Sequence, residues 1–596
     1  RITGDVVNAL TQGRVRLHQM LVRQGDPGAN TEVILAAMAQ ARADGIRVTV
    51  FPEWALSGFL AGPEWLDGSR LRACERGLAR IVEASQGLAV ILGTVVSYRG
   101  RLVGAAVAAE DGRRVAPAGS PLPFVPKLLS PQNRFDGVSG LLCAGAVAAM
   151  EGVPLPALFA PFTLSGMTVA AWCGQALPNG CNAVRQDADL LLRLDTRPYT
   201  RDQPLGDAPV ADDVPAACCC GTGVVDAGKV LFALAGGTQV RWPDGRVQHA
   251  PLLREATLDL TMPSDSTVAQ ADHTAPRVVI DVMERACRLQ LERLGLRRVV
   301  VGASGGIDSA LAAALYRCVV GPENLLLVNM PSRYSSGTTI GLARRLAANL
   351  GCYYTEIPIQ ESVELTKRQI EGCVCERPGG EKRALVLSDL AVENVQARDR
   401  SGRVLAAMSS AFGGVFTCNT NKSESTIGYG TMYGDNAGFF AALGDLWKSE
   451  IWELARCYNA EVFGSEMIPQ GSITIVPSAE LSSAQNVDEG KGDPLVYAWH
   501  DRLFAAWTER PVPVTVDELV RGYAAGTVGE ITGYPDDLRA LFPDEASFRN
   551  DLTRMWRLYN GLARAKRLQA PPVLSLKSRT FGFDLGSAQL PVFDER

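Results

Sequence analysis

The stretch Val299–Ala313, VVVGASGGIDSALAA, decides the fold of the second half of the chain. The apolar β-branched run Val299–Val301 predicts a buried strand, and Ser309–Ala313 predicts the helix that follows it. Between them, a glycine-rich turn aims backbone N–H groups and a helix N-terminus at one point, a geometry that binds phosphate. The turn lacks the Gly-Lys-Ser/Thr end of a Walker loop. It therefore predicts a nucleotide site of another kind.

The residues of this turn supply the groups that a phosphate needs. The adjacent glycines Gly305 and Gly306 let a phosphate approach the backbone closely. Ser304 and Ser309 add hydroxyl donors, and Asp308 places a carboxylate where a phosphate-bound Mg2+ needs one. A glycine-rich turn alone is also compatible with a purely structural role. The full SGGIDS string after a buried strand favours the nucleotide site, and it resembles the pyrophosphatase loop of the ATP-pyrophosphatase superfamily.

Length and composition limit the other possibilities. The chain has 596 residues, which predicts several domains, and 47% hydrophobic with 21% charged residues is typical of a soluble globular protein. A net charge of −5 argues against a general nucleic-acid binder. The apolar runs are too short to cross a membrane. The fourteen cysteines lack zinc-site spacings and no signal peptide is apparent, so we expect a cytoplasmic protein with free thiols.

The first half of the chain alternates predicted strands with predicted helices, which indicates an α/β layered sheet. Three chemically active residues stand at predicted strand ends: Glu53, Lys127 and Cys173. A thiol nucleophile needs a base and a cation that stabilises the developing oxyanion, and these three residues would supply those roles. Singly, each is equally explained as a surface carboxylate, a lysine covering apolar surface or a buried thiol.

In this order and spacing, the three residues resemble the triad of nitrilase-superfamily amidases. The resemblance covers roughly residues 15–254 and rests on FPEWALSGF, on the lysine segment KLLSPQNRFD and on the strand that ends at Cys173. It implies a four-layer α-β-β-α sandwich. It also implies that Glu53 is the general base, Lys127 the oxyanion support and Cys173 the nucleophile.

The surroundings of the triad depart from the glutamine-using members of that superfamily. Cys173 is followed by Gly174-Gln175 instead of Glu-Asp, and Arg197-Pro198-Tyr199 stands where a Ser-Pro-Phe helps to hold glutamine. Asn133–Asp136 is kept, but Gly137 and Gly140-Leu141 replace acidic and Arg-Tyr positions. We expect a working glutaminase because all three chemical groups are present. An altered amide donor or a silent domain remains the alternative.

The junction and the second half have a different pattern. We expect an amidase domain over residues 1–260, a linker over 261–276 and a nucleotide-binding domain over 277–596, because residues 263–276 are polar and lack an apolar period. Predicted strands at 299–301, 325–330 and 353–359 alternate with predicted helices at 278–294 and 338–350. This alternation predicts a doubly wound parallel sheet.

Several downstream strings carry further charged groups: ENVQAR, NKSE, GYGTMYGD and DLWK. Glu424 in NKSE could give Mg2+ a second carboxylate beside Asp308. Lys422 and Lys448 could then neutralise phosphate charge. Each of these residues alone would be explained as a solvated surface charge.

Together with PSRYSS, PSAEL and QAPPVLSLKSRTFG, these strings resemble those of NAD+ synthetases over about residues 278–582. With an amidase domain in front, the resemblance is to the glutamine-dependent, fused type. It implies two substrate sites and a Mg2+ site. The implied ATP ligands are Gly302, Ser304, Gly305, Gly306, Asp308, Ser309, Arg333, Asn419 and Lys448; the implied deamido-NAD+ ligands are Asn394, Arg398, Lys422, Glu424 and Asp435; the implied Mg2+ ligands are Asp308 and Glu424.

The resemblance implies ATP-dependent amidation of deamido-NAD+ to NAD+ through an acyl-adenylate. Ammonia would come from glutamine, and shielded ammonia transfer within a homo-oligomer is expected because ammonia is mostly protonated at pH 7. Three alternatives stay open at this point. They are an ammonia-dependent synthetase with a silent front domain, another ATP-pyrophosphatase amidator, and a nucleotide-binding regulatory protein.

Overall fold

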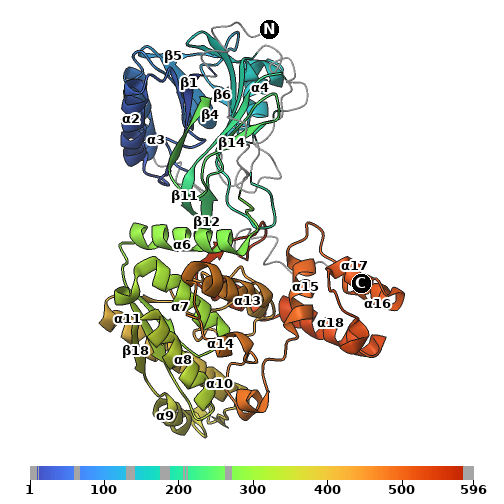
Figure 1. Cartoon of the computed structure of the whole chain (residues 1–596). Coiled ribbons are helices and arrows are strands. Elements are labelled where there is room, and N and C mark those ends of the chain that lie inside the picture. Colours follow the sequence, from blue (N-terminus) through green and yellow to red (C-terminus); the bar gives the residue numbers. More distant parts are fainter. Residues whose placement is uncertain are drawn as a thin grey trace. The chain divides into compact units, whose positions relative to one another are not determined.

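The computed structural model describes residues 10, 12–59, 68–128, 141–174, 177, 188–205, 208–209, 213–261 and 271–581. The chain divides into two compact units, and each is described by itself (Figure 1). The first unit comprises Arg1–Ala227 and Phe232–His273, and the second comprises Gly228–Leu231 and Thr274–Arg596. The expected linker therefore spans the division between the units, although residues 262–270 lie outside the described part of the chain.

Two sheets form the centre of the first unit. In the first sheet the strand order is β15-β1-β2-β3-β4-β5, and β6 pairs with β4; in the second it is β14-β13-β10-β9-β8-β7. The first sheet consists of β1 (Gln12–Gln19), β2 (Val48–Val50), β3 (Ala89–Tyr98), β4 (Arg101–Glu110), β5 (Arg113–Val115), β6 (Val125–Pro126) and β15 (Ala256–Thr261). The second consists of β7 (Phe162–Leu164), β8 (Met167–Cys173), β9 (Leu190–Asp195), β10 (Ala216–Cys220), β13 (Gln239–Arg241) and β14 (Val247–His249).

Alternation along the strands builds the layers of this unit. Ala89 and Ile91 of β3 belong to a core shared with β8, β9 and β10, so the two sheets face each other. Val90 and Leu92 belong to a second core with Ile34 and other residues of α2 (Pro27–Ala43) and α3 (Gly68–Glu83). These two helices therefore cover the outer face of the first sheet, as Figure 1 shows. These three layers, helices, first sheet and second sheet, have the order expected for the predicted α-β-β-α sandwich, and the α/β class is confirmed.

Helix α2 begins at Pro27, and the Asp26 side chain accepts a hydrogen bond from the Ala29 N–H at 2.9 Å. Asp before a proline is a favourable helix start, because the carboxylate pairs with an N–H that has no helical partner and proline needs no N–H at that position. The Asn30 amide ties the helix to its surroundings by donating to the carbonyls of Arg23 and Leu56.

A parallel sheet forms the centre of the second unit. Its order is β18-β17-β16-β21, and every neighbouring pair is parallel. The strands are β16 (Val299–Gly302), β17 (Leu325–Asn329), β18 (Tyr353–Glu356) and β21 (Val415–Phe416). The predicted strand at 353–359 thus ends earlier, at Glu356. The order, with β17 and β21 on opposite sides of β16, confirms the doubly wound prediction.

Helices surround this sheet, and a helical group follows it along the chain (Figure 1). The helices connecting or flanking the strands are α6 (Pro276–Arg293), α7 (Ile307–Val320), α8 (Gly337–Leu350), α9 (Gln360–Ile370), α10 (Asp389–Arg398), α11 (Ala406–Phe412), α12 (Lys422–Ile427), α13 (Lys448–Cys457) and α14 (Gln470–Thr474). The later group contains α15 (Tyr497–Thr508), α16 (Val516–Ala525), α17 (Val528–Thr532), α18 (Glu545–Asn560) and α19 (Ala563–Gln569). Buried aromatic residues, among them Trp499, Trp507 and Phe548, form the core of this group. Among the described residues, no helix has both the length and the apolar character that crossing a membrane requires.

Two candidate active sites

Glu53 and Lys127 form a buried ion pair in the first unit. The Lys127 Nζ lies 2.5 Å from the Glu53 Oε1, and the side chains are 3% and 2% exposed. Glu53 follows β2, and Lys127 follows directly after β6. Strand ends in a layered sheet place their side chains at its edge, so two residues 74 positions apart meet.

Cys173 is the last residue of β8, and the charges of both Glu53 and Lys127 affect the pKa of its thiol. Burial raises the pKa of its thiol well above the usual range, the Glu53 charge raises it further, and Lys127 opposes the shift. Gly174 has a φ of +91°, and a Cβ there would lie 3.3 Å from the Lys127 Nζ, so the ammonium lies beside the residue after the thiol. The three predicted residues therefore lie near one another, and the charges of Glu53 and Lys127 act on the Cys173 thiol in opposite directions.

Close backbone packing holds Glu53 in place. A Cβ on Gly93 of β3 would lie 2.5 Å from the Glu53 Cα, so only glycine leaves room there. The Thr196 hydroxyl donates to the Glu53 carbonyl at 2.7 Å. Trp54 has a φ of +58°, and its ring lies 5.4 Å from the Lys127 Nζ. A non-glycine residue in the left-handed region next to a catalytic candidate is typical of strain held at a functional site.

Some of the unusual residues around the triad have structural partners. Arg197 Nε pairs with Asp195 at 2.6 Å, and the buried Tyr199 donates its hydroxyl to the His273 carbonyl at 2.5 Å. The segment containing Asn133–Asp136, Gly137 and Gly140, and also Gln175, lies outside the described residues.

The second site is a cavity of about 260 Å³ at the carboxyl ends of β16 and β17. This edge of a parallel sheet is where ligands bind in doubly wound folds. Its floor is the SGGIDS turn. Gly305, with a φ of +90°, does not line the cavity; a Cβ on it would collide with the carbonyl of Thr339. The glycine is thus required for the close approach of α8 to the turn.

The serine hydroxyls of the turn bond within it. Ser309 Oγ accepts from the Ser304 N–H at 3.2 Å and donates to the Gly306 carbonyl at 3.1 Å. Ser304 Oγ accepts from the Gly306 N–H at 3.2 Å. These bonds stiffen the loop, which reduces the conformational freedom that binding a phosphate would otherwise have to remove.

Two carboxylates share one lysine at the cavity. Lys448 Nζ lies 2.5 Å from Asp308 and 3.3 Å from Glu424, and Asn421 donates to the other oxygen of Asp308 at 2.8 Å. Burial alone would lower the pKa of Lys448, but Asp308 and Glu424 raise it. Burial raises the pKa of Glu424 to about 8, because the attraction of Lys448 is partly cancelled by the charge of Asp308. Two carboxyl groups therefore share one lysine, and Glu424 keeps its proton to a higher pH than an ordinary glutamate does.

This excess of carboxylate fits Mg2+. The ion prefers oxygen ligands and is usually held by one or two carboxylates together with substrate phosphates. Asp308 and Glu424 supply two carboxylates that face the cavity. Within the described ranges, no group of three or more histidine, cysteine, aspartate or glutamate residues forms a complete metal cage. The residues thus fit a cation that binds together with a phosphate ligand.

Three cavity residues were missed from the sequence: Arg400, Glu480 and Asp493. Arg400 lies in a π-helical segment, Asp399–Leu405, directly after α10, and its Nε donates to the Met330 carbonyl at 3.1 Å. Glu480 accepts from the Ser336 N–H at 3.2 Å and the Thr339 hydroxyl at 2.7 Å. The tyrosine hydroxyls of Tyr429 and Tyr497 donate to Asp493 at 3.0 and 2.8 Å. Two of the three residues had a sequence signal, because Arg400 comes two residues after ENVQAR and Glu480 lies within PSAEL.

Comparisons with known proteins agree with this geometry. A family profile described as NAD synthase matches residues 252–523. A glutamine-dependent NAD(+) synthetase of Xanthomonas campestris is 30% identical over 539 residues, which are 87% of this chain and 91% of that protein. The chain belongs to the glutamine-dependent NAD(+) synthetase family.

Solved structures of members of this NAD(+) synthetase family share the fold. The enzyme from Cytophaga hutchinsonii has a TM-score of 0.72 at 15% identity, covering 98% of this chain and 97% of its own. The enzyme from Acinetobacter baumannii, solved in complex with ADP, has a TM-score of 0.63 at 21% identity, covering 97% and 98%. These likenesses agree with the sandwich and the doubly wound sheet described above.

Most of the ligands expected from the NAD(+) synthetase resemblance line the cavity, and five do not. The lining includes Gly302, Ser304, Gly306, Asp308, Ser309, Asn419, Glu424, Asp435 and Lys448. Besides Gly305, three residues outside the cavity lining have partners elsewhere. Arg333 pairs with Glu364, the Asn394 side chain accepts from the Thr431 hydroxyl, and Arg398 donates to the Met432 carbonyl. Their assigned roles stay predictions.

Lys422 is the clearest correction among the residues taken from the NAD(+) synthetase motifs. Its side chain is 0% exposed, and its ammonium donates to Asp445, to Glu509 and to the Arg579 carbonyl. All three of its N–H groups have partners inside the protein. The structure therefore does not support the predicted contact of Lys422 with phosphate or deamido-NAD+.

Proposed function

We propose that this chain converts deamido-NAD+ to NAD+, using ATP to activate the nicotinate carboxylate and glutamine as the source of nitrogen. Family membership supports the overall reaction. The observation that carries the assignment to particular residues is the arrangement of Asp308, Lys448 and Glu424 above the SGGIDS turn. It provides a cation and two carboxylates at one end of a parallel sheet.

The cavity residues would act on the phosphates of ATP. The nicotinate carboxylate attacks the α-phosphorus, which forms an acyl-adenylate and releases pyrophosphate; ammonia then attacks the acyl carbon and expels AMP. Bound Mg2+, held by Asp308 and Glu424, would supply charge neutralisation on the phosphates. Lys448 would lie against the same charge, and the stiffened turn would present its N–H groups in place. Arg400, also at the cavity, is a candidate for an anionic group of either substrate.

The triad would supply the ammonia. Cys173 would attack the side-chain amide of glutamine, with Glu53 accepting the thiol proton and returning it to the leaving ammonia. Lys127 would stabilise the negative oxygen of the tetrahedral intermediate. Water would then hydrolyse the thioester to glutamate. The buried Glu53–Lys127 pair and the nearby thiol support these roles.

Pyrophosphate release from ATP tests the central proposal. The full chain is supplied with deamido-NAD+ and, in separate reactions, with glutamine or an ammonium salt. We expect release in both reactions, together with NAD+ formation. No release in either would overturn the proposal. Release with a different carboxylate acceptor, but not with deamido-NAD+, would assign the chain another amidation reaction.

The variant Cys173→Ala tests the nitrogen source. We expect its glutamine-driven rate to fall by at least about 10³-fold, because the nucleophile is lost, and its ammonium-driven rate to stay within about twofold. Cys143→Ala is the matched control, because Cys143 is another thiol of the same unit that caps the short helix α4 (Ala144–Glu151). Equal and substantial glutamine-driven rates in the wild type and in Cys173→Ala would remove Cys173 from glutamine hydrolysis. Rates that are negligible in both would favour the second candidate. That candidate is an ammonia-dependent synthetase, which the altered residues around Cys173 suggest.

A further inference from the structure

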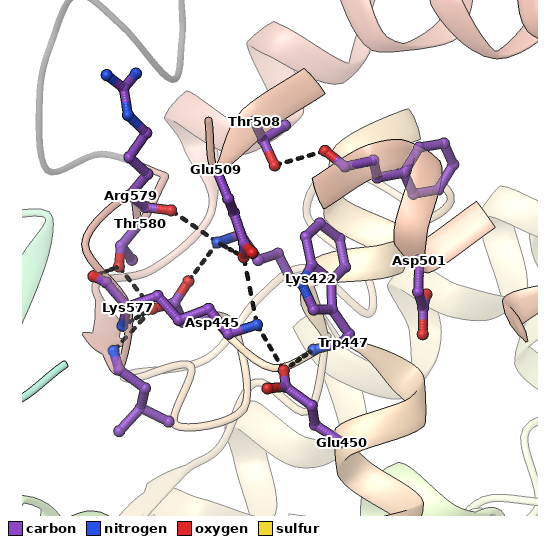
Figure 2. Close-up of polar contacts among 12 residues, drawn as sticks. Lys422, Asp445, Trp447, Glu450, Asp501, Thr508, Glu509, Lys577, Arg579 and Thr580 are labelled. Atoms are coloured by element: carbon purple, nitrogen blue, oxygen red, sulfur yellow. Dashed lines mark hydrogen bonds and ion pairs between the residues drawn. The ribbon is translucent and has the colours of Figure 1, made fainter. Parts of the chain in front are cut away.

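A cluster of buried charges lies outside the cavity (Figure 2). Lys422 Nζ donates to Asp445 Oδ1 at 2.7 Å, to Glu509 Oε1 at 2.9 Å and to the Arg579 carbonyl at 2.7 Å. A second lysine, Lys577, lies 2.6 Å from Glu450 and 3.3 Å from Glu509. We call these five side chains, Lys422, Asp445, Glu450, Glu509 and Lys577, the lysine–carboxylate cluster.

The cluster holds a segment from far along the chain. The second oxygen of Asp445, Oδ2, accepts the N–H groups of Leu576 and Lys577 at 2.7 and 2.9 Å. The same oxygen accepts the Thr580 hydroxyl at 2.6 Å. As Figure 2 shows, Trp447 lies among these groups; its ring is 5.2 Å from the Lys422 ammonium and 5.0 Å from that of Lys577. Residues 576–580 therefore close over one side of the cluster.

The cluster is directly connected to helix α12, which carries Glu424. Lys422 is the first residue of this helix, and the Lys422 N–H donates to the Leu446 carbonyl at 2.9 Å. The preceding Asn421 caps the helix through the Glu424 N–H and also donates to Asp308. A displacement of Lys422 would thus move the cap, and with it both carboxylates of the cavity.

The cluster is connected in the same way to α13, which begins with Lys448. The Trp447 N–H donates to Glu450 at 2.8 Å, which places the helix start directly against Lys577. The two helix starts are also joined to each other, because the Lys448 N–H donates to Ser423 Oγ at 2.9 Å. Each helix therefore has one residue in the cluster two positions from a charged residue of the cavity, Lys422 and Glu424 in α12 and Glu450 and Lys448 in α13.

We propose that the lysine–carboxylate cluster positions Glu424, Asp308 and Lys448 for nucleotide binding, and that Lys422 and Lys577 are positioning residues of the reaction. This inference rests on the proposed function only in that the cavity is taken to bind ATP. Removing charges from water is costly, and well-packed apolar residues are often as stable as a buried ion pair. A purely structural joint between α12, α13 and residues 576–580 would not need five ionised groups. Hydrogen bonds have fixed directions. They therefore hold the two helix starts in a single orientation more precisely than apolar packing does.

Calorimetric titration of the full-length wild type and a Lys577→Met variant with ATP tests the proposal. Lys577 does not line the cavity, and methionine keeps much of its apolar volume. We expect the Kd for ATP to rise about tenfold, because neighbouring residues in one hydrogen-bonded network couple by about that factor. Lys577→Arg, which keeps the charge, should recover most of the affinity. An unchanged Kd in Lys577→Met would overturn the proposal.

A matched control separates positioning from general loss of stability. Asp551→Asn weakens the buried pair in which Asp551 and His500 lie 3.0 Å apart. His500 belongs to helix α15, and Glu509 follows directly after the end of this helix. We expect this control to lower the Tm while the Kd for ATP stays within about twofold. A control that weakens ATP binding as much as Lys577→Met, at a comparable loss of Tm, would also overturn the proposal.

A milder variant covers the case in which Lys577→Met does not fold. Thr580→Val removes only the hydroxyl that donates to Asp445, and we expect it to raise the Kd for ATP about threefold. An unchanged Kd in a folded Thr580→Val protein would count against the cluster. These titrations contain neither deamido-NAD+ nor glutamine. Absence of NAD+ formation would therefore not change the measured Kd values for ATP. Unchanged Kd values in the variants would likewise not count against NAD+ formation.

Discussion

Glu424 and Glu509 both lie beside a buried lysine, yet their pKa values shift in opposite directions. For both residues, burial raises the pKa. Glu509 contacts Lys422 and Lys577, and the two cations outweigh burial, which lowers its pKa to about 2. Glu424 shares the single cation of Lys448 with Asp308, and its pKa rises to about 8. The number of cations for each carboxylate thus differs between the cluster and the cavity.

This difference distinguishes the lysine–carboxylate cluster from the cavity. In the cluster, Glu509 has two lysines of the protein beside it. In the cavity, Asp308 and Glu424 share one lysine, and a cation from solution would favour the ionised form of Glu424. The same residue types therefore serve two purposes within one unit. Four experiments test the difference between the cluster and the cavity.

Lys448→Met should reduce pyrophosphate release by about 10²–10³-fold, with either glutamine or ammonium, because a preorganised cation beside the phosphates is lost. Steady-state kcat/KM for ATP measures the effect. Arg344→Met is a suitable control, since Arg344 is 63% exposed and pairs with Glu356. A change smaller than about threefold in Lys448→Met would remove Lys448 from the reaction.

Lys422→Met should cost about 3 kcal/mol of folding stability, because it leaves the buried Asp445 without its closest cation. Urea unfolding measures the free energy. Lys448→Met should cost less, since Asp308 and Glu424 keep 19% and 18% of their side chains exposed and can be hydrated or protonated. Equal losses in the two variants would contradict the distinction between cluster and cavity.

The binding of Mg2+ and ATP near pH 7 should release up to about one proton. Glu424, with a pKa raised to about 8, is mostly protonated at that pH, and a cation ligand must be ionised. Calorimetry in two buffers of different ionisation enthalpy counts the protons. In Glu424→Gln this release should disappear. Proton release that is unchanged in the variant would assign it to another group.

The same raised pKa gives the free protein a pH-dependent stability. The folded state holds the Glu424 proton up to about pH 8, whereas the unfolded chain loses it near 4.5. The unfolded state therefore binds fewer protons in this window, and stability falls as the pH rises from about 4.5 to 8. Glu424→Gln should make the dependence shallower by up to about one proton in slope. A slope equal to that of the wild type in urea unfolding between pH 5 and 8 would contradict this assignment.

Parts of the fold and site were predictable because their causes are local. The SGGIDS turn follows from a β-branched run, glycines and a helix start that lie within fifteen positions. Glu53, Lys127 and Cys173 could be proposed together because each ends or follows a strand, on two sheets that face each other. Lys422 was misplaced because its partners Asp445, Glu509 and Arg579 lie 23, 87 and 157 positions away. In the sequence, it differs little from Lys448. Only tertiary packing separates a lysine enclosed by protein groups from one that faces a cavity.

Arg400 shows a second limit. It was missed because residues 399–405 form a π-helical segment between α10 and α11. The wider turn shifts which residues share a face, so a helical period of 3.6 extended from ENVQAR does not place Arg400 correctly. Such local insertions leave no clear composition signal, although they are frequent at functional sites.

The contacts of Asp445 with residues 576–580 also impose an order of events during synthesis. Asp445 emerges 131 positions before Leu576 and 135 before Thr580. At about 5–20 residues per second, the ribosome needs roughly 7–26 seconds to add that stretch. Through this interval Asp445 lacks three of its donors, and α12 and α13 have not yet received their last joint. The nucleotide site is therefore among the last parts of the nascent chain to mature, long after the first unit has left the ribosome.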